Sequence, residues 1–264
     1  MPVATVEAGG VALAFEERGA GPPVVLVHGT AIARSVWRET ITALGDGVRT
    51  IAYDRRAYGD SGAPAPYGGT TVGEQADDLA ELIETLDAAP ATLCGHELGA
   101  LACLDLMLRY PRLAKGAVLI EPAMLWLSPV GTDAVGMLRE VVQKAAYERG
   151  PGGAVEAFIE AVDGHAALRL LGDDRLAGAR ATPRAFAADL AAPSTWAAGR
   201  RELRRIATPI TILIGERSAP VRRDAARALA GMLPQAELRE LPAGHLAHVE
   251  APAQVAAAIA ERAA

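Results

Sequence analysis

Short continuous apolar runs alternate with stretches of helical periodicity along most of this chain, and this alternation constrains the fold more than any other feature. The runs are 23–27, 48–53, 91–94, 117–120 and 209–214. Continuous apolar runs of this length are typical of parallel strands that are covered by helices on both faces. Because the strand and helix patterns alternate, the sequence predicts an α/β protein with a mostly parallel sheet.

Further patterns complete this sheet and its helices. Residues 3–7 and 11–16 flank Gly9-Gly10 and predict a hairpin, and the alternating residues 236–241 predict an edge strand, which gives eight strands. Apolar residues at three- and four-residue spacing predict helices over 35–44, 72–88, 98–110, 221–232 and 252–262. Thr71, followed three residues later by Glu74, is a capping-box pattern that marks the start of the second of these helices.

Residues 122–207 interrupt the alternation. They contain helical patterns around 135–149 and 153–162, then a Gly/Pro/Ala-rich stretch, and no strand pattern. An insertion after the carboxyl end of a strand covers the crevice where open α/β sheets bind ligands. We therefore expect a helical lid over 122–207, on a core domain formed by residues 1–121 and 208–264.

Composition excludes several classes of function. The net charge is −6 and no basic stripe is present, which argues against nucleic acid as a partner. No apolar run reaches the length of a membrane span, and the segment after Met1 lacks the basic and apolar regions of a signal peptide. Cys94 and Cys103 fall on different predicted elements, so we expect free buried thiols and a cytoplasmic protein.

Five loops that carry polar residues follow predicted strands of the sheet. They are His28-Gly29-Thr30, Gly95–Gly99, Glu121-Pro122, Gly215–Ser218 and Ala243–His245. The carboxyl ends of parallel strands meet at one edge of a sheet, which is where ligands bind in such folds. The loops together predict a site at this edge.

The segments around these loops resemble the α/β-hydrolase family along nearly the whole chain. The matching stretches, in family order, are "VVLVHGT", "YDRRAYGDSG", "LCGHELGALACL", "VLIEPAM", "PITILIGERSAP" and "LPAGHLAHVEAP". The resemblance implies an α/β-hydrolase fold with a mostly parallel eight-stranded sheet. It also implies an enzyme that acts on a small molecule without a cofactor or a metal ion.

The resemblance also implies catalytic roles for particular positions. Gly95-x-Glu97-x-Gly99 resembles the nucleophile elbow, a strained strand-to-helix turn that places Glu97 in the nucleophile position. The backbone amides of Leu98 and Thr30 would form the oxyanion hole. His245 resembles the catalytic base of the family.

The residue at position 97 departs from the usual serine. Family members that open epoxides or displace halide carry an aspartate there, and Glu97 has the same carboxylate on a side chain that is one methylene longer. Carboxylates attack saturated carbon to form an alkyl ester, whereas attack on an ester would give a more reactive mixed anhydride. Serine-esterase chemistry is therefore not expected.

A second departure lies at Ser218, where the family commonly has the aspartate that orients the histidine. Glu121 ends the strand before the insertion, and some family members take the acid from that site, so it is our candidate for this role. A direct pair between Glu97 and His245 is the alternative, which would make a separate acid less necessary.

We expect His28, Trp126, Tyr147 and Trp196 to contact the substrate, with core packing as the simpler interpretation of Trp126 and Trp196. The epoxide and dehalogenase subfamilies have side motifs that this chain lacks. Leu98 stands where their tryptophan often follows the aspartate, and Tyr147 is the only tyrosine in the lid.

The favoured function is therefore a cofactor-free enzyme in which Glu97 and His245 perform carboxylate chemistry, either nucleophilic or acid/base, such as epoxide hydrolysis. Two alternatives remain open: a lyase, isomerase or cyclase in a biosynthetic pathway, and a catalytically silent ligand-binding protein. Replacement of a native serine at position 97 is a further interpretation, but it would not explain Ser218. A homodimer is compatible with the sequence.

Overall fold

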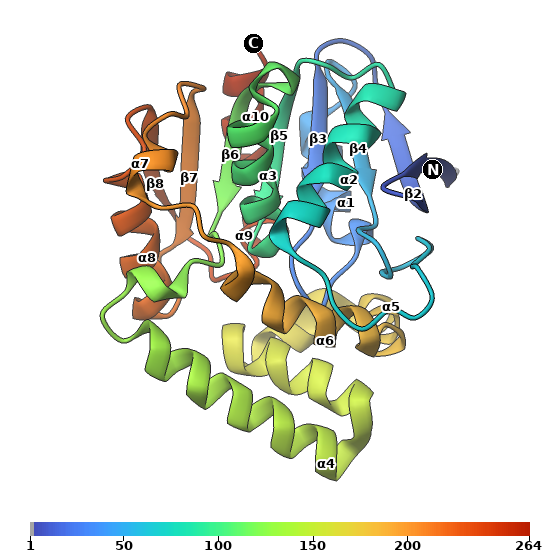
Figure 1. Cartoon of the computed structure of the whole chain (residues 1–264), viewed down its shortest axis with the longest axis vertical. Coiled ribbons are helices and arrows are strands. Elements are labelled where there is room, and N and C mark those ends of the chain that lie inside the picture. The colour runs from blue at the N-terminus through green and yellow to red at the C-terminus, as the bar shows by residue number, and fades with distance from the viewer. Residues whose placement is uncertain (1–2) are drawn as a thin grey trace.

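The chain forms one eight-stranded sheet in the order β1-β2-β4-β3-β5-β6-β7-β8, in a computed structural model that describes residues 3–264 (Figure 1). The strands are β1 (Ala4–Ala8), β2 (Val11–Arg18), β3 (Pro23–Val27), β4 (Arg49–Tyr53), β5 (Ala91–His96), β6 (Ala114–Ile120), β7 (Ile210–Gly215) and β8 (Ala236–Leu241). The pairs β1–β2 and β2–β4 are antiparallel, and the other five pairs are parallel. The predicted α/β class, the parallel sheet and the edge position of 236–241 are confirmed.

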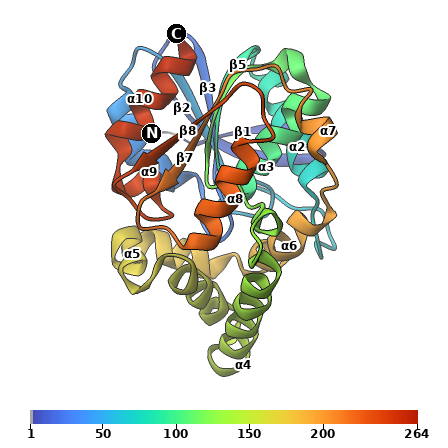
Figure 2. The same cartoon turned by 90° about the vertical axis from the view of Figure 1, so that its left-hand side faces the viewer.

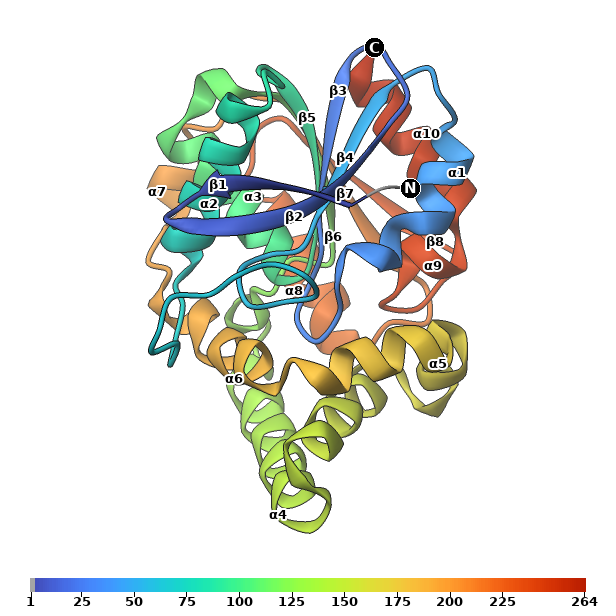
Figure 3. The same cartoon turned by 90° about the vertical axis from the view of Figure 1, so that its right-hand side faces the viewer.

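Helices cover both faces of the sheet, as Figures 2 and 3 show. The helices of the core are α1 (Arg38–Leu44), α2 (Val72–Thr85), α3 (Leu98–Arg109), α8 (Pro220–Ala230), α9 (Ala247–Glu250) and α10 (Pro252–Ala263). The short helix α7 (Arg200–Leu203) lies within the residues expected to form the lid, but its Leu203 packs in the core. Helices α1, α9 and α10 pack on one face, and α2, α3 and α8 on the other. Thr71 caps α2 by accepting a hydrogen bond from the Glu74 amide, as the capping-box pattern predicts.

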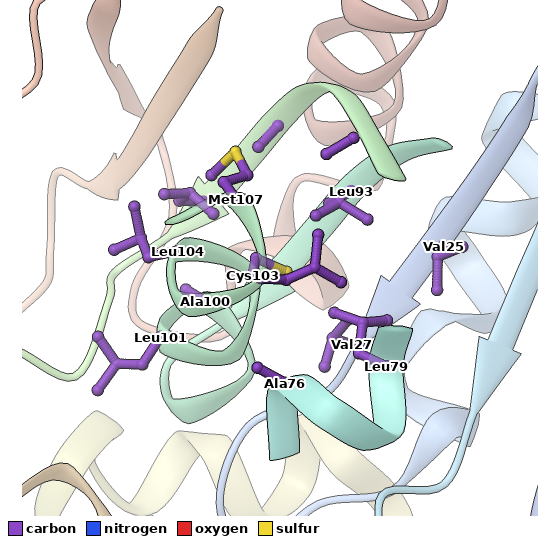
Figure 4. Packing of buried hydrophobic residues seen from close by; sticks show 14 of the residues in the cluster. Val25, Val27, Ala76, Leu79, Leu93, Ala100, Leu101, Cys103, Leu104 and Met107 are labelled. Atoms are coloured by element: carbon purple, nitrogen blue, oxygen red, sulfur yellow. The ribbon is translucent and has the colours of Figure 1, made fainter. Parts of the chain in front are cut away.

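The core is filled by Leu, Val, Ile and Ala side chains in two clusters, one on each face of the sheet. Figure 4 shows the cluster around α3, in which Leu101, Leu104 and Met107 are packed with residues of β3, β5 and α2. Cys103 belongs to this cluster, whereas Cys94 on β5 faces the opposite one. Both thiols are free and buried, which confirms the prediction.

Three helices fill most of the inserted segment: α4 (Gly131–Asp163), α5 (His165–Ala181) and α6 (Pro183–Ala191). They gather at the end of the sheet where the parallel strands terminate (Figures 1 and 3). A kink at Gly150, which has φ = 75° and precedes Pro151, divides α4 into two arms that match the predicted segments 135–149 and 153–162.

The Gly/Pro/Ala-rich stretch is also helical, which the sequence pattern did not indicate. Alanine is the strongest helix former, and the breaks fall at single residues. Gly164 and Gly172 have φ values of 78° and 75°, and Pro183 occupies the first turn of α6, where its missing N–H costs nothing. Among residues 3–264, no helix combines the length and the apolar character that crossing a membrane requires.

Candidate active site

Glu97 occupies a strained turn between β5 and α3. Its backbone lies at φ = 53° and ψ = −111°, a conformation that side-chain-bearing residues rarely adopt. A Cβ on Gly95 would lie 2.6 Å from the Gly99 carbonyl oxygen, and a Cβ on Gly99 would lie 2.4 Å from the Val27 carbonyl oxygen. Both glycines are therefore required by the close approach of backbone, as expected for an elbow.

The Glu97 carboxylate uses one oxygen to bind the turn and leaves the other unbound. Oε2 accepts hydrogen bonds from the Leu98 amide at 2.6 Å, from the Thr30 amide at 3.1 Å and from the Thr30 hydroxyl at 2.7 Å. Oε1 forms no hydrogen bond with any residue in the range 3–264. The two amides predicted to form an oxyanion hole thus converge on a single point, and Oε2 lies there.

His245 is oriented by a carboxylate from β6 and not from β7. Its Nδ1 donates to Oε2 of Glu121 at 2.7 Å. The other Glu121 oxygen accepts from the Gly215 amide at 2.9 Å and from the Ser218 hydroxyl. Burial by itself raises the pKa of Glu121, but the hydrogen bond from His245 and the charges of His245 and Arg222 hold it below its ordinary value. Ser218 thus supports the acid from the position where an acid is usual.

The alternative of a direct Glu97–His245 pair is not what the structure shows. Among residues 3–264, the only ion pair of His245 is with Glu121. The reason is geometric: the Glu97 carboxylate is drawn to the Thr30 and Leu98 donors, while the Nδ1 side of His245 is already occupied.

Two further histidines, His96 and His28, are buried beside the site. The His96 ring packs 4.5 Å from that of His245, centroid to centroid, and its burial lowers its pKa well below the ordinary value. His28 is fully buried, and its Nε2 accepts from the Arg55 amide at 2.9 Å. The prediction that His28 contacts substrate is wrong, because its ring holds the backbone of the next loop.

A cavity of about 730 Å³ opens beside Glu97, between the sheet edge and the inserted helices. Trp126 and Trp196 line it together with Thr30, Phe158 and many apolar residues of α4 and α6. Trp196 also donates its Nε1 to Asp105 at 2.8 Å, which fixes its ring. Tyr147 does not line this cavity and is 93% exposed, so the prediction that it contacts substrate is wrong. It lies on the outer side of α4.

A second cavity lies on the His245 side of Thr30 and Phe158, which line both. Its volume is about 20 Å³, which is enough for one water molecule. Polar groups of His245, His96 and Asp163 surround it. The site therefore combines a large, mostly apolar space at Glu97 with a water-sized space at His245.

The inserted helices are fastened to the catalytic loops by two aspartates that the sequence patterns did not single out. Asp163, at the end of α4, accepts from the His245 amide at 2.7 Å. Asp189, on α6, pairs with Arg55 at 2.5 Å, and both side chains are fully buried. Arg55 in turn donates to the carbonyl oxygens of His28 and Gly29. A lone acidic residue within the apolar, alanine-rich stretch of the insertion was the signal that could have identified Asp189.

Arg222 is a third residue that the patterns missed. It lies in the first turn of α8, is only 6% exposed and lines the large cavity. The sequence offered one signal for Arg222. It is a cation two residues after Pro220, on the helix predicted to follow the site loop Gly215–Ser218. Within residues 3–264, no group of three His, Cys, Asp or Glu side chains is arranged to hold a metal ion.

Comparison with known proteins is consistent with this geometry. A family model described as "Alpha/beta hydrolase family" matches residues 24–258. The chain is 35% identical over 116 residues to a 2-(acetamidomethylene)succinate hydrolase of Mesorhizobium japonicum, which covers 44% of this chain and 41% of that protein. It is 39% identical over 92 residues to an epoxide hydrolase of Caballeronia sordidicola, covering 34% and 28%. These matches span less than half of the relatives' lengths.

Among solved structures, a malate-bound thermophilic esterase from Thermogutta terrifontis superposes with a TM-score of 0.80 at 26% identity. The match covers 99% of this chain and 97% of the esterase. The likeness therefore extends over the sheet and the inserted helices together.

Proposed function

Because the chain belongs to the alpha/beta hydrolase family, we propose that it is a hydrolytic enzyme in which Glu97 attacks an electrophilic saturated carbon, with an epoxide as the leading substrate class. The observation that carries the proposal is the state of the Glu97 carboxylate, in which, among the described residues, Oε2 has three donors and Oε1 has none. One relative of the chain is an epoxide hydrolase. The two free cysteines support a cytoplasmic location.

In the first step, Oε1 attacks an epoxide carbon and the C–O bond of the ring breaks. The three donors to Oε2 fix the carboxylate before the substrate reacts. The entropy cost of ordering the Glu97 side chain is therefore not part of the reaction barrier. The product of this step is an alkyl ester of Glu97. No tyrosine lines the cavity, so the opened oxygen takes its proton from water.

In the second step, water hydrolyses this ester. Negative charge develops on the carbonyl oxygen of the ester, and Oε2 already lies at the Thr30 and Leu98 amides that stabilise it. His245, held by Glu121, removes the proton from the attacking water. The 20 Å³ cavity beside His245 and Thr30 is a suitable position for that water.

The proposal can be tested with styrene oxide in isotope-labelled water. In a single turnover in H₂¹⁸O, we expect an unlabelled diol and one labelled oxygen in Glu97, measured by mass spectrometry of the product and of the tryptic peptide. His245→Gln should accumulate the ester as an intact-mass adduct, and Glu97→Gln should form none. The second variant is the matched control, because it keeps the size of the side chain and removes the charge.

Other outcomes support the competing functions. A diol that carries the label after one turnover, with Glu97 unlabelled, would mean direct attack by water. Products that never contain the label over many turnovers would indicate a lyase or an isomerase. If neither turnover nor an adduct occurs with a panel of terminal and internal epoxides, the covalent mechanism is excluded and a ligand-binding protein is favoured.

A further inference from the structure

Arg222 is a buried cation that has no anionic partner among residues 3–264. Its Nη1 is shielded from solvent and forms no hydrogen bond with any residue of the range 3–264. The described residues also contain no salt bridge to this side chain, which is 94% buried and lines the cavity that holds Glu97. A guanidinium in such a position costs free energy unless an anion meets it.

The other buried arginines of residues 3–264 are all paired. Arg34 binds Asp54, Arg55 binds Asp189 and Arg56 binds Asp78. Asp189 also lines the cavity, but its charge is taken by Arg55. Arg222 is the one buried arginine left without a carboxylate in the described chain. The exception coincides with the cavity, which indicates that its partner enters from there.

The two carboxylates of the site do not serve as this partner. Both oxygens of Glu121 are occupied, by His245 on one side and by Gly215 and Ser218 on the other. Glu97 directs Oε2 to the backbone donors at Thr30 and Leu98. The charge of Arg222 does reach Glu121 through space and contributes to its lowered pKa, but no direct contact forms.

We propose that Arg222 binds a carboxylate group of the substrate, so that the natural substrate is an organic acid that carries the electrophilic carbon. Only the statement that the substrate carries an electrophilic carbon rests on the proposed function. Binding of a carboxylate by Arg222 does not require any reaction. Arg222 lies in the first turn of α8, whose N-terminal amides add positive potential.

The rest of the cavity limits the kind of acid. Apart from Arg222, its lining is dominated by apolar side chains that include Trp126, Trp196 and Phe158. Arg222 is the one buried guanidinium among the cavity's lining residues, since Arg139 is exposed. A single buried guanidinium matches a planar monoanion, which it can bind through two parallel hydrogen bonds. The structure therefore favours a monocarboxylate with an apolar body.

The anion site can be tested by binding alone. The probe is 4-phenylbutyrate, with the uncharged 4-phenylbutyramide as its matched ligand, measured by calorimetry on the full chain. We expect the wild type to prefer the acid and Arg222→Gln to weaken acid binding about 10- to 100-fold, which corresponds to the loss of one charge-assisted hydrogen bond or bidentate pair. Arg139→Gln is the control, because Arg139 also lines the cavity but is exposed.

A purely structural role for Arg222 would give a different stability result. If its partner is the substrate, the unliganded protein contains an uncompensated charge, so Arg222→Gln should raise Tm without ligand and lose the Tm increase that 4-phenylbutyrate gives the wild type. A lower Tm of the unliganded variant, together with unchanged acid binding, would overturn the proposal. So would equal affinity of the wild type for the acid and the amide.

A kinetic arm separates this inference from the proposed chemistry. With 5,6-epoxyhexanoate and its amide, the wild type should show a higher kcat/KM for the acid, mainly through KM, and Arg222→Gln should abolish that ratio. If no epoxide is turned over but the Arg222-dependent binding is observed, the chemistry fails and the anion site stands. If both epoxides are turned over at equal kcat/KM, the chemistry stands and the anion site fails.

Discussion

At the scale of single residues, the two oxygens of each carboxylate in the site have different hydrogen-bond partners. Glu97 gives one oxygen to the backbone donors and keeps one for the cavity. Glu121 gives one to His245 and one to Gly215 and Ser218. Each carboxylate is thus both anchored and directed, because its second oxygen fixes the orientation of the first.

The first prediction concerns the pH dependence that Glu121 contributes. Its pKa is lower in the folded protein than the value of about 4.3 in an unfolded chain. The stability that results is therefore fully present above the unfolded pKa and is lost as the pH falls through the folded pKa. We expect the difference in free energy of unfolding between wild type and Glu121→Gln to shrink as the pH is lowered from 6 to 3.

Urea denaturation at a series of pH values measures this difference. Glu140→Gln is the control, since Glu140 is exposed and makes no ion pair among the described residues. Its difference from the wild type should stay constant over the same range. A constant difference for Glu121→Gln as well would contradict the prediction.

The second prediction concerns Ser218, which donates to Glu121. Ser218→Asp restores the residue that the family usually has, but here it would place two buried carboxylates against each other. We expect a loss of about 3–5 kcal/mol in the free energy of unfolding, since one charge would be uncompensated. In the Glu121→Gln background, Ser218→Asp should reduce the free energy of unfolding much less. The site then holds one carboxylate, at position 218 and not at 121.

A double-mutant cycle by chemical denaturation gives the coupling directly. Additive costs of the two substitutions would show that positions 121 and 218 do not share one acid site.

At the scale of elements, α6 is joined to the loop after β3 through one buried ion pair. Arg55 binds Asp189 of α6 and also the carbonyl oxygens of His28 and Gly29, and the Tyr58 hydroxyl donates to Asp189 as well. The loop that presents the Thr30 amide is therefore held by a residue whose counter-charge lies on an inserted helix. Movement of α6 and the geometry of the oxyanion hole are coupled through this contact.

The third prediction tests this coupling with Asp189→Asn. The substitution leaves Arg55 buried without a counter-charge, so we expect a loss of about 3–5 kcal/mol of stability and faster hydrogen exchange at the Thr30 amide. The control is Glu156→Gln, which removes the partner of Arg180 in a more exposed pair of the same segment and should cost only about 0–1 kcal/mol. An unchanged rate of hydrogen exchange at the Thr30 amide in Asp189→Asn would show that α6 and the loop after β3 are not coupled.

At the scale of the whole molecule, one sheet separates two hydrophobic cores, and the site is formed where the ends of five strands meet the inserted helices. Cys94 and Cys103 lie in different cores, with fully buried side chains. Burial raises the pKa of both thiols well above the ordinary value. The two cysteines thus report on the integrity of both sides of the sheet.

The fourth prediction is that neither thiol reacts with an aromatic disulfide reagent in the native protein. Because the thiolate is the reactive form and both sulfurs are excluded from solvent, modification requires unfolding. Labelling should yield two modified sulfurs per chain and accelerate with urea in parallel with the loss of helical circular dichroism. Cys103→Ala should leave one slow site, and fast labelling of the native protein would disprove the prediction.

The sequence was sufficient for the sheet and for the five loops at its edge, because continuous apolar strands and glycine-flanked turns are local signals. It also indicated Glu121 as a partner of His245, and this contact is present, although the catalytic role of the pair stays a prediction. Helices α5 and α6 were missed because Gly164, Gly172 and Pro183 divide this stretch into short helical pieces.

The errors within the site concern the directions of side chains. Tyr147 lies on a predicted helix of the insertion, but only the packing of α4 decides which face looks outward. Likewise, the Glu97 carboxylate binds two backbone amides and not His245. These amides belong to Thr30 and Leu98, which are 67 residues and one residue away along the chain. The place of Arg222 on a predicted helix after a site loop was visible in the sequence, but its lack of a partner among the described residues is visible only in the structure.

The carboxylate at the elbow also determines which chemical reagents can detect this protein. Fluorophosphonates and sulfonyl fluorides label hydrolases of this architecture by phosphonylating or sulfonylating an activated alcohol, and Glu97 offers none. A proteome-wide profile made with such reagents would leave this protein unlabelled even where it is abundant and active. Probes that carry an epoxide ring or an alkyl halide are the ones suited to label Glu97 covalently.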